Sequence, residues 1–154
     1  MDDDVDDEPL NGATMTTPTG LLVLSLPIAD RRESMVFYRD AFGFAPIGEP
    51  AEDGVPEPLQ FRLNDQALLM LVPTGGFGWL LGEERRLAPP GTNECLLSMA
   101  VPTEAHVAEL MDRVRAGGGG VISEPQQHPW GYSGVCSDLD GHLWQVIVQP
   151  PQDS

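Results

Sequence analysis

Few side chains in this sequence are able to ligate a metal or transfer a proton, and they do not cluster along the chain. His106 falls in the first turns of an expected helix, His128 in a loop, and His142 directly after a turn glycine. Asp138 and Asp140 could act as a general-acid pair, but their spacing beside a glycine is typical of a turn. We expect structural or surface roles for all five, and no Ser-His-Asp signature is present.

The two cysteines, Cys95 and Cys136, lie far apart and form no CxxC motif. This spacing argues against a structural zinc site and against a disulfide framework. We expect both to be buried free thiols. The run Gly117–Gly120 lacks a following Lys-Ser or Lys-Thr pair and precedes a strand, so we interpret it as a helix stop and not as a phosphate loop.

Aromatic residues are better suited to bind an organic molecule. Trp79 and Trp130 fall in expected loops where they could rim a cavity, and Tyr132 begins the strand after Trp130. Trp144 falls on the last expected strand, where we expect it to pack between the strand face and a helix. Aromatic walls with a few polar points are typical of small-molecule pockets. For the glycine-rich segment 73–79 we expect a tight turn, with a mobile lid as the alternative.

The elements that must position these residues occur twice in the chain. A fixed internal period is the mark of a duplicated structural unit, and two copies are too few for a solenoid. We therefore predict a pseudo-twofold pair of units. Four residue pairs share one offset of about 75 positions: Pro27 with Pro102, Ile47 with Ile122, Glu49 with Glu124, and Pro50 with Pro125.

Each copy is predicted to run strand, helix, strand, strand, strand. In the first copy, Asp30 and Glu33 form a capping box, and Gly43 ends the helix after about residue 42. In the second copy, Thr103 caps a helix that ends at the glycine run. The expected strands are 21–26, 44–48, 59–63 and 67–72 in the first copy and 94–101, 121–123, 132–137 and 143–149 in the second.

The charge of the chain restricts its partners. The formal net charge is −16, and six acidic residues among the first eight leave −10 for the remainder. Such a surface repels nucleic acid and anionic membranes and tolerates cationic ligands. No apolar run approaches the roughly 20 residues that span a bilayer. The acidic N-terminus is unlike a secretory signal, so we expect a cytoplasmic protein without membrane or nucleic-acid partners.

Several separated motifs, in this order, resemble the vicinal oxygen chelate superfamily of glyoxalases, bleomycin-resistance proteins and ring-cleaving dioxygenases. They are Leu26–Asp30, Phe37–Phe44, Trp130–Gly134 and Asp138–Trp144. The resemblance covers about residues 20–149. It implies an α+β fold in which two tandem βαβββ modules form a pair of cupped, mostly antiparallel half-barrels. It also implies a homodimer, because the half-barrels need to be covered.

On this basis we divide the chain into a glyoxalase-like domain at residues 20–150 and two short tails. The modules are expected at about residues 20–73 and 93–150. Residues 1–19 are acidic and then rich in Thr, Pro and Gly, with almost nothing to bury, so they are predicted to be disordered. Met15 is a candidate start of the protein. Residues 151–154 form the second tail.

Metal-dependent members of the resembled superfamily hold a divalent cation with four His, Gln or Glu side chains. The cation binds two substrate oxygens and acts as a Lewis acid. The matching positions here are Val23, Leu69, Leu96 (or Ser98 in an alternative register) and Gln145. Divalent ions need carboxylate and imidazole donors, and three of these positions are apolar or at best hydroxyl. One glutamine cannot hold a metal, so we expect neither a metal nor another cofactor.

The sequence therefore predicts a protein with a degenerate metal site that binds a small organic ligand, largely apolar and aromatic or cationic, in an apolar cavity. The alternative is a divalent-metal-dependent lyase, isomerase or dioxygenase whose ligands fall elsewhere, with Glu94 or Cys95 brought inward by a slip of register. A third option is an assembly role, with the hollow filled by side chains. The candidate ligand-binding residues are Val23, Leu69, Trp79, Leu96, Trp130, Tyr132 and Gln145.

Overall fold

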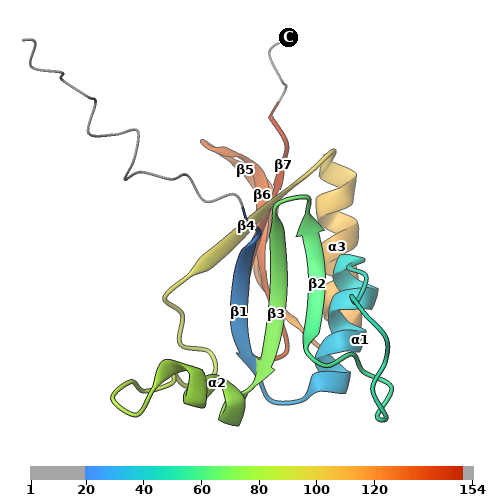
Figure 1. The fold of residues 1–154 in the computed structure, drawn as a ribbon. Helices are drawn as coiled ribbons and strands as arrows, with labels where there is room; N and C mark the ends of the chain where they lie inside the picture. The colour runs from blue at the N-terminus through green and yellow to red at the C-terminus, as the bar shows by residue number, and fades with distance from the viewer. Residues whose placement is uncertain (1–19, 151–154) are drawn as a thin grey trace, which may run out of the picture.

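The computed structural model describes residues 20–150, and the two predicted tails lie outside the described residues. Two open sheets and the helices beside them form an α+β fold, which confirms the predicted class (Figure 1). The elements are β1 (Leu22–Ile28), α1 (Arg31–Phe42), β2 (Leu59–Asn64), β3 (Ala67–Pro73), α2 (Thr74–Leu81), β4 (Leu96–Val101), α3 (Glu104–Ala116), β5 (Gly120–His128), β6 (Gly131–Ser137) and β7 (Leu143–Val148).

The two long helices begin and end where their local signals predict. The Asp30 side chain accepts a hydrogen bond from the backbone N–H of Glu33, and Gly43 ends α1 in the left-handed region with φ 74°. Thr103 caps α3 by accepting from the backbone N–H of His106. The predicted helix stop at Gly117 is confirmed. Because these caps fix where each helix starts, they also fix which faces are buried.

Each sheet has a parallel pair at one side and antiparallel pairs beyond it. The first sheet has the order β1-β3-β2 and the second the order β4-β7-β6-β5. β1 runs parallel to β3, β4 runs parallel to β7, and the other three pairs are antiparallel. The edge strands β1 and β4 are therefore the counterparts of one another, as the internal repeat predicts.

The first sheet has one strand fewer than the repeat predicts. The expected strand at residues 44–48 is wrong, because only an isolated bridge between Pro46 and Phe61 forms there. Proline has no backbone N–H to donate to a ladder, so pairing does not extend beyond this point. The two modules thus share a strand, a helix and a final hairpin, but the first module lacks the strand expected after Gly43.

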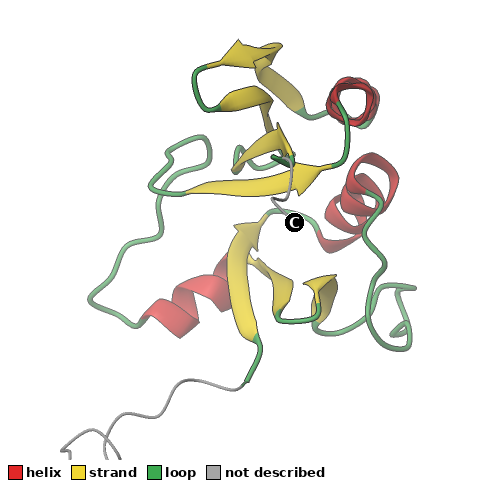
Figure 2. Cartoon of the chain, turned by 90° about the horizontal axis from the view of Figure 1, so that it is seen from above, coloured by secondary structure: helices red, strands yellow, loops and turns green. Residues whose placement is uncertain are grey.

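The segment that follows β3 is helical. The expected tight turn is wrong, because residues 74–81 form α2. Three glycines weaken this helix intrinsically, but the Thr74 hydroxyl donates to the backbone oxygen of Ile28 at 3.0 Å and Phe77 is half-buried. Figures 1 and 2 show α2 on the opposite side of the sheets from α1 and α3. Across residues 20–150, no helix is long and apolar enough to cross a membrane.

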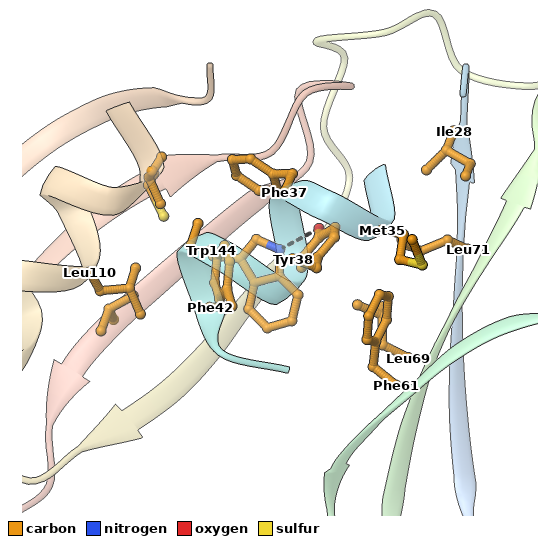
Figure 3. Packing of buried hydrophobic residues seen from close by; sticks show 14 of the residues in the cluster. Ile28, Met35, Phe37, Tyr38, Phe42, Phe61, Leu69, Leu71, Leu110 and Trp144 are labelled. Atoms are coloured by element: carbon orange, nitrogen blue, oxygen red, sulfur yellow. Dashed lines mark hydrogen bonds between the residues drawn. The ribbon is translucent and has the colours of Figure 1, made fainter. Parts of the chain in front are cut away.

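The core lies between the two halves and is built around aromatic rings from α1 and β7. The Tyr38 hydroxyl donates to Asp138 Oδ2 at 2.6 Å. Trp144 Nε1 donates to the same hydroxyl oxygen at 3.0 Å, as the dashed line in Figure 3 shows. The Phe42 ring lies 5.1 Å from that of Trp144. Trp144 is buried, as its position on the last strand predicts. One polar network therefore joins α1 to the second sheet inside an apolar core.

Burial shifts the titration of the groups in this core. Desolvation by burial, assisted by the neighbouring Asp138 carboxylate, raises the pKa of Tyr38 well above its usual value. Desolvation likewise raises the pKa of Asp138, although the contact with His142 and the hydrogen bond from Tyr38 oppose the shift. The Cys136 thiol is raised to a pKa of about 12 by the same burial. Cys136 is buried as expected, whereas Cys95 is exposed, so the expectation for Cys95 is wrong.

Candidate functional site

Alternation along the strands gives the four-stranded sheet one buried face and one outward face. Trp144 and Val146 on β7 are buried in the core, so Gln145 between them points to the opposite side. Ser98 on β4 pairs directly with Gln145, and its hydroxyl donates to Gln145 Oε1 at 3.1 Å. Leu96 shares this side of β4 and is 50% exposed. We call this surface the outward face of the four-stranded sheet.

Trp130 lies in the β5–β6 hairpin, and its side chain is hydrogen-bonded to a residue of the outward face. Its indole Nε1 donates to Ser133 Oγ at 3.3 Å, and Ser133 pairs with Ile147, which lies on the Gln145 side of β7. The ring of His128 stacks on the indole with centroids 4.5 Å apart and 4° between the planes. Trp130 remains 60% exposed, so a fixed indole is presented to solvent beside the outward face.

In the first module, Val23 points away from the core, as Leu96 does in the second. Leu69 points into the core instead. Val23 is 42% exposed, and its neighbours Leu24 and Leu26 pack against the core. Leu69 is fully buried in the core cluster, whereas Met70, the next residue along β3, falls at the repeat offset from Gln145. A shift of one residue in a strand moves a side chain to the opposite face of the sheet.

Tyr132 and Trp79 are also placed apart from Gln145. Tyr132 is partly buried against the core, since its neighbour Ser133 occupies the outward side of β6. Trp79 is 81% exposed on α2. The structure thus places Leu96, Gln145 and Trp130 on one sheet, with Leu96 near the start of β7 and Trp130 near its end, and it places Val23 on the other sheet. It adds Ser133, which the sequence could not reveal because the β6–β7 register depends on the hairpin between them.

The residues present do not fit a divalent cation. Val23, Leu96, Ser98 and Gln145 offer one amide and one hydroxyl, and these two groups bond to each other. Within the described residues, no three His, Cys, Asp or Glu side chains lie close enough to hold a metal ion. His106 Nδ1 contacts the Thr103 hydroxyl at 2.6 Å, and His142 Nε2 contacts the Pro27 carbonyl oxygen at 2.6 Å. What the outward face can offer a ligand is apolar contacts, amides and hydroxyls, and one exposed indole.

Comparisons with known proteins agree with this architecture. A glyoxalase-related enzyme from Fulvimarina pelagi is 28% identical, with a TM-score of 0.73 over 89% of this chain and 94% of that one. A hypothetical protein from S. aureus is 24% identical, with a TM-score of 0.73 over 87% and 96%. TnmS3, an antibiotic binding protein from Streptomyces sp. CB03234, is 22% identical, with a TM-score of 0.60 over 88% and 100%.

The family itself follows from the sequence match. No curated protein matches this chain. The model of the Glyoxalase/Bleomycin resistance protein/Dioxygenase superfamily matches residues 20–146, which is nearly the whole of the described part. The order of helices and strands and the resemblance predicted from the motifs agree with that match. The chain therefore belongs to the Glyoxalase/Bleomycin resistance protein/Dioxygenase superfamily.

Proposed function

We propose that this protein binds a small organic molecule, largely apolar and aromatic or cationic, on the outward face of the four-stranded sheet, without a metal ion. The observation that carries the proposal is that one face of this sheet presents both an exposed, fixed indole and a fixed amide. Trp130 is fixed through Ser133, and Gln145 is fixed through Ser98. Fixed groups lose little entropy when a ligand binds, which favours recognition.

The charge of the protein favours a cation among such ligands. The net charge of −16 creates an attractive potential for cations and a repulsive one for anions. The exposed face of an indole also attracts cations through its quadrupole. TnmS3 is described as an antibiotic binding protein, and its likeness to this chain supports the fold alone. Together with the negative charge and the exposed indole of this chain, that description makes aromatic cationic antibiotics a rational first panel of probes.

The proposal includes a homodimer that covers the outward faces. Leu96 and Val23 expose apolar side chains on separate sheets, and apolar surface of this kind gains free energy when a second copy buries it. A second copy would place the outward face of one module over that of another and enclose the ligand. The binding site is thus formed by two chains. A cytoplasmic location stays a prediction.

Binding is tested by replacing the indole. We expect isothermal titration to detect binding of an aromatic cation from a panel that includes glycopeptide antibiotics. Trp130→Ala should weaken binding about tenfold, because a desolvated cation–π contact contributes on the order of 1–2 kcal/mol. Val36→Ala, which removes an exposed apolar side chain from α1, is the matched control and should leave affinity unchanged. Equal losses in both variants would contradict the proposed site.

The same preparation separates this proposal from metal-dependent catalysis. Metal analysis of protein purified without chelator is expected to find no stoichiometric zinc, nickel, manganese or iron. One bound ion per chain would overturn the proposal and favour a lyase, isomerase or dioxygenase with ligands outside the outward face.

The dimer is tested by placing a charge on the outward face. We expect sedimentation to give about twice the chain mass of 16.7 kDa for the unmodified protein and a single chain mass for Leu96→Arg. The physical reason is that a buried unpaired guanidinium opposes association. Leu139→Arg, on another exposed surface, should remain dimeric. A monomeric unmodified protein would show that the outward faces are not covered by a second copy.

A further inference from the structure

A cavity of about 370 Å³ lies between the two modules, at the end of the outward face where Leu143 begins β7. It is bounded by the second half of β1, by α2, by the segment 86–95 and by the start of β7. Figure 1 shows α2 and the chain that leads from it to β4 beside the lower end of β1. None of the seven candidate ligand-binding residues lines this cavity. It adjoins the outward face at Leu143, but its lining residues differ from those of the site proposed above.

The walls of the cavity are mainly apolar and come from both modules. Its lining includes Leu26, Pro27, Phe77, Leu81, Leu97 and Leu143. Pockets of 300–1,000 Å³ with mostly apolar walls are the usual size for small organic ligands. The space thus has the volume and the lining to enclose a small hydrophobic molecule.

Three of the polar side chains in the walls are bonded within the protein. Thr74 donates to the Ile28 carbonyl oxygen at 3.0 Å, and Asn93 Nδ2 donates to the Gly141 carbonyl oxygen at 2.8 Å. Asp140 Oδ1 accepts from the Ala29 backbone N–H at 2.9 Å. Since these groups are engaged, they hold the walls together and offer little hydrogen bonding to a ligand.

The segment 86–95 is held close to the second module by backbone packing. A Cβ atom added to Gly141 would stand 2.7 Å from the backbone nitrogen of Gly91, so the two chains approach as closely as glycine allows. The bond from Asn93 to Gly141 fixes the same contact. The cavity is thus closed on this side by a segment that is tied down, which favours a formed pocket over an open surface.

The charges at the cavity select against anions. Arg86 and Glu94 both line it, are both exposed and carry opposite signs. Asp140 adds a second carboxylate to the lining, so the carboxylates outnumber the guanidinium and an anionic ligand is repelled. We propose that this cavity is a second binding site, for a small, uncharged, predominantly apolar molecule.

Two fluorescent probes that share one aromatic framework test the proposal. N-phenyl-1-naphthylamine is uncharged, and 8-anilinonaphthalene-1-sulfonate adds a sulfonate. We expect the uncharged probe to bind saturably, with one molecule per chain, and to bind about tenfold more tightly than the sulfonate. Leu81→Arg should weaken the uncharged probe about tenfold. Leu80→Arg, on the same helix but outside the lining, should not change its affinity.

A thiol provides an independent measure of occupancy. Cys95 lines the cavity and is exposed, whereas Cys136 is buried with its pKa raised to about 12, so alkylation of the native protein reports on Cys95. Saturating uncharged probe is expected to slow alkylation of Cys95 in the unmodified protein and in Leu80→Arg. Unchanged alkylation, or equal affinity in the two leucine variants, would overturn the proposal. Loss of probe binding in Trp130→Ala would assign the probe to the outward face instead.

Discussion

Tyr38→Phe is expected to lower the free energy of unfolding by about 3 kcal/mol, because one hydroxyl serves two buried partners and each unpaired group costs about 1–3 kcal/mol. The hydroxyl donates to Asp138 Oδ2 and accepts from Trp144 Nε1. Phenylalanine fills the same space in the core, so the loss measures the two hydrogen bonds and not a cavity. Urea denaturation followed by tryptophan fluorescence gives the change directly.

The environment of Asp138 makes the loss large. Its other carboxylate oxygen, Oδ1, accepts from the backbone N–H groups of Asp140 and His142, so the side chain also shapes the turn before β7. Desolvation raises the pKa of Asp138, and the hydrogen bond from Tyr38 is one of the contacts that oppose the shift. Removing the Tyr38 hydroxyl therefore leaves the buried Asp138 carboxylate with one hydrogen bond fewer in the folded state.

The pH dependence of this variant gives a second measure. A folded-state pKa above the unfolded value means that ionisation of Asp138 opposes folding, and this penalty is complete only above the folded pKa. In Tyr38→Phe that pKa rises further, so the stability deficit should be greatest near neutral pH and should shrink as pH falls toward the unfolded value of about 4.

The control for Tyr38→Phe is Tyr132→Phe. The Tyr132 hydroxyl makes no side-chain hydrogen bond among residues 20–150, and its ring is only partly buried. Tyr132→Phe should therefore lower the free energy of unfolding by less than about 0.5 kcal/mol. Equal destabilisation by the two substitutions at neutral pH would show that the bonds to Asp138 and Trp144 contribute little to stability.

The parts of the fold that the sequence predicts well are those with signals only a few residues apart. Asp30, Gly43 and Thr103 each act on backbone groups within one helical turn, so the ends of α1 and α3 could be placed without knowledge of the rest of the molecule. The same holds for the Asp140-Gly141 turn, which limits the start of β7. The order of elements then follows, and with it the resemblance to the superfamily.

The candidate site was predicted less completely because the face of a side chain depends on register. The position of Gln145 follows from the motif that ends at Trp144, the residue directly before it. Its side chain does point outward. Leu69 was assigned as its counterpart one position away from Met70, and this step alone moves the side chain into the core. Tyr132 shows the same dependence, since its orientation follows from the pairing of Ser133 with Ile147.

The helix α2 was missed because tertiary contacts outweigh its composition. Three glycines among eight residues predict a turn, yet the segment is held by the Thr74 bond to Ile28 and by burial of part of Phe77. Trp79 and Leu80 on this helix are exposed, so no apolar periodicity marked it in the sequence. The cavity beneath α2 was therefore invisible before the structure.

Gly119→Ala is expected to destabilise the protein by about 3 kcal/mol, at the upper end of the cost of overpacking a core. A Cβ atom there would stand 2.5 Å from the backbone oxygen of Ser137, 2.8 Å from Val114 Cγ1 and 2.9 Å from Phe37 Cε2. The Ser137 oxygen cannot move aside cheaply, because Ser137 pairs with Gly120 at the start of the β5–β6 ladder. The shift would have to separate α3 from that ladder.

The matched control is Gly78→Ala, because Gly78 lies inside α2 with nothing within 4 Å of an added Cβ. Alanine is favoured over glycine in a helix by about 1 kcal/mol, so this variant should be unchanged or slightly more stable. Urea midpoints of the two variants should therefore move in opposite directions. If Gly119→Ala unfolds at the midpoint of the unmodified protein, the close approach of α3 to β6 is not a constraint, and the glycine run after α3 serves only to end the helix.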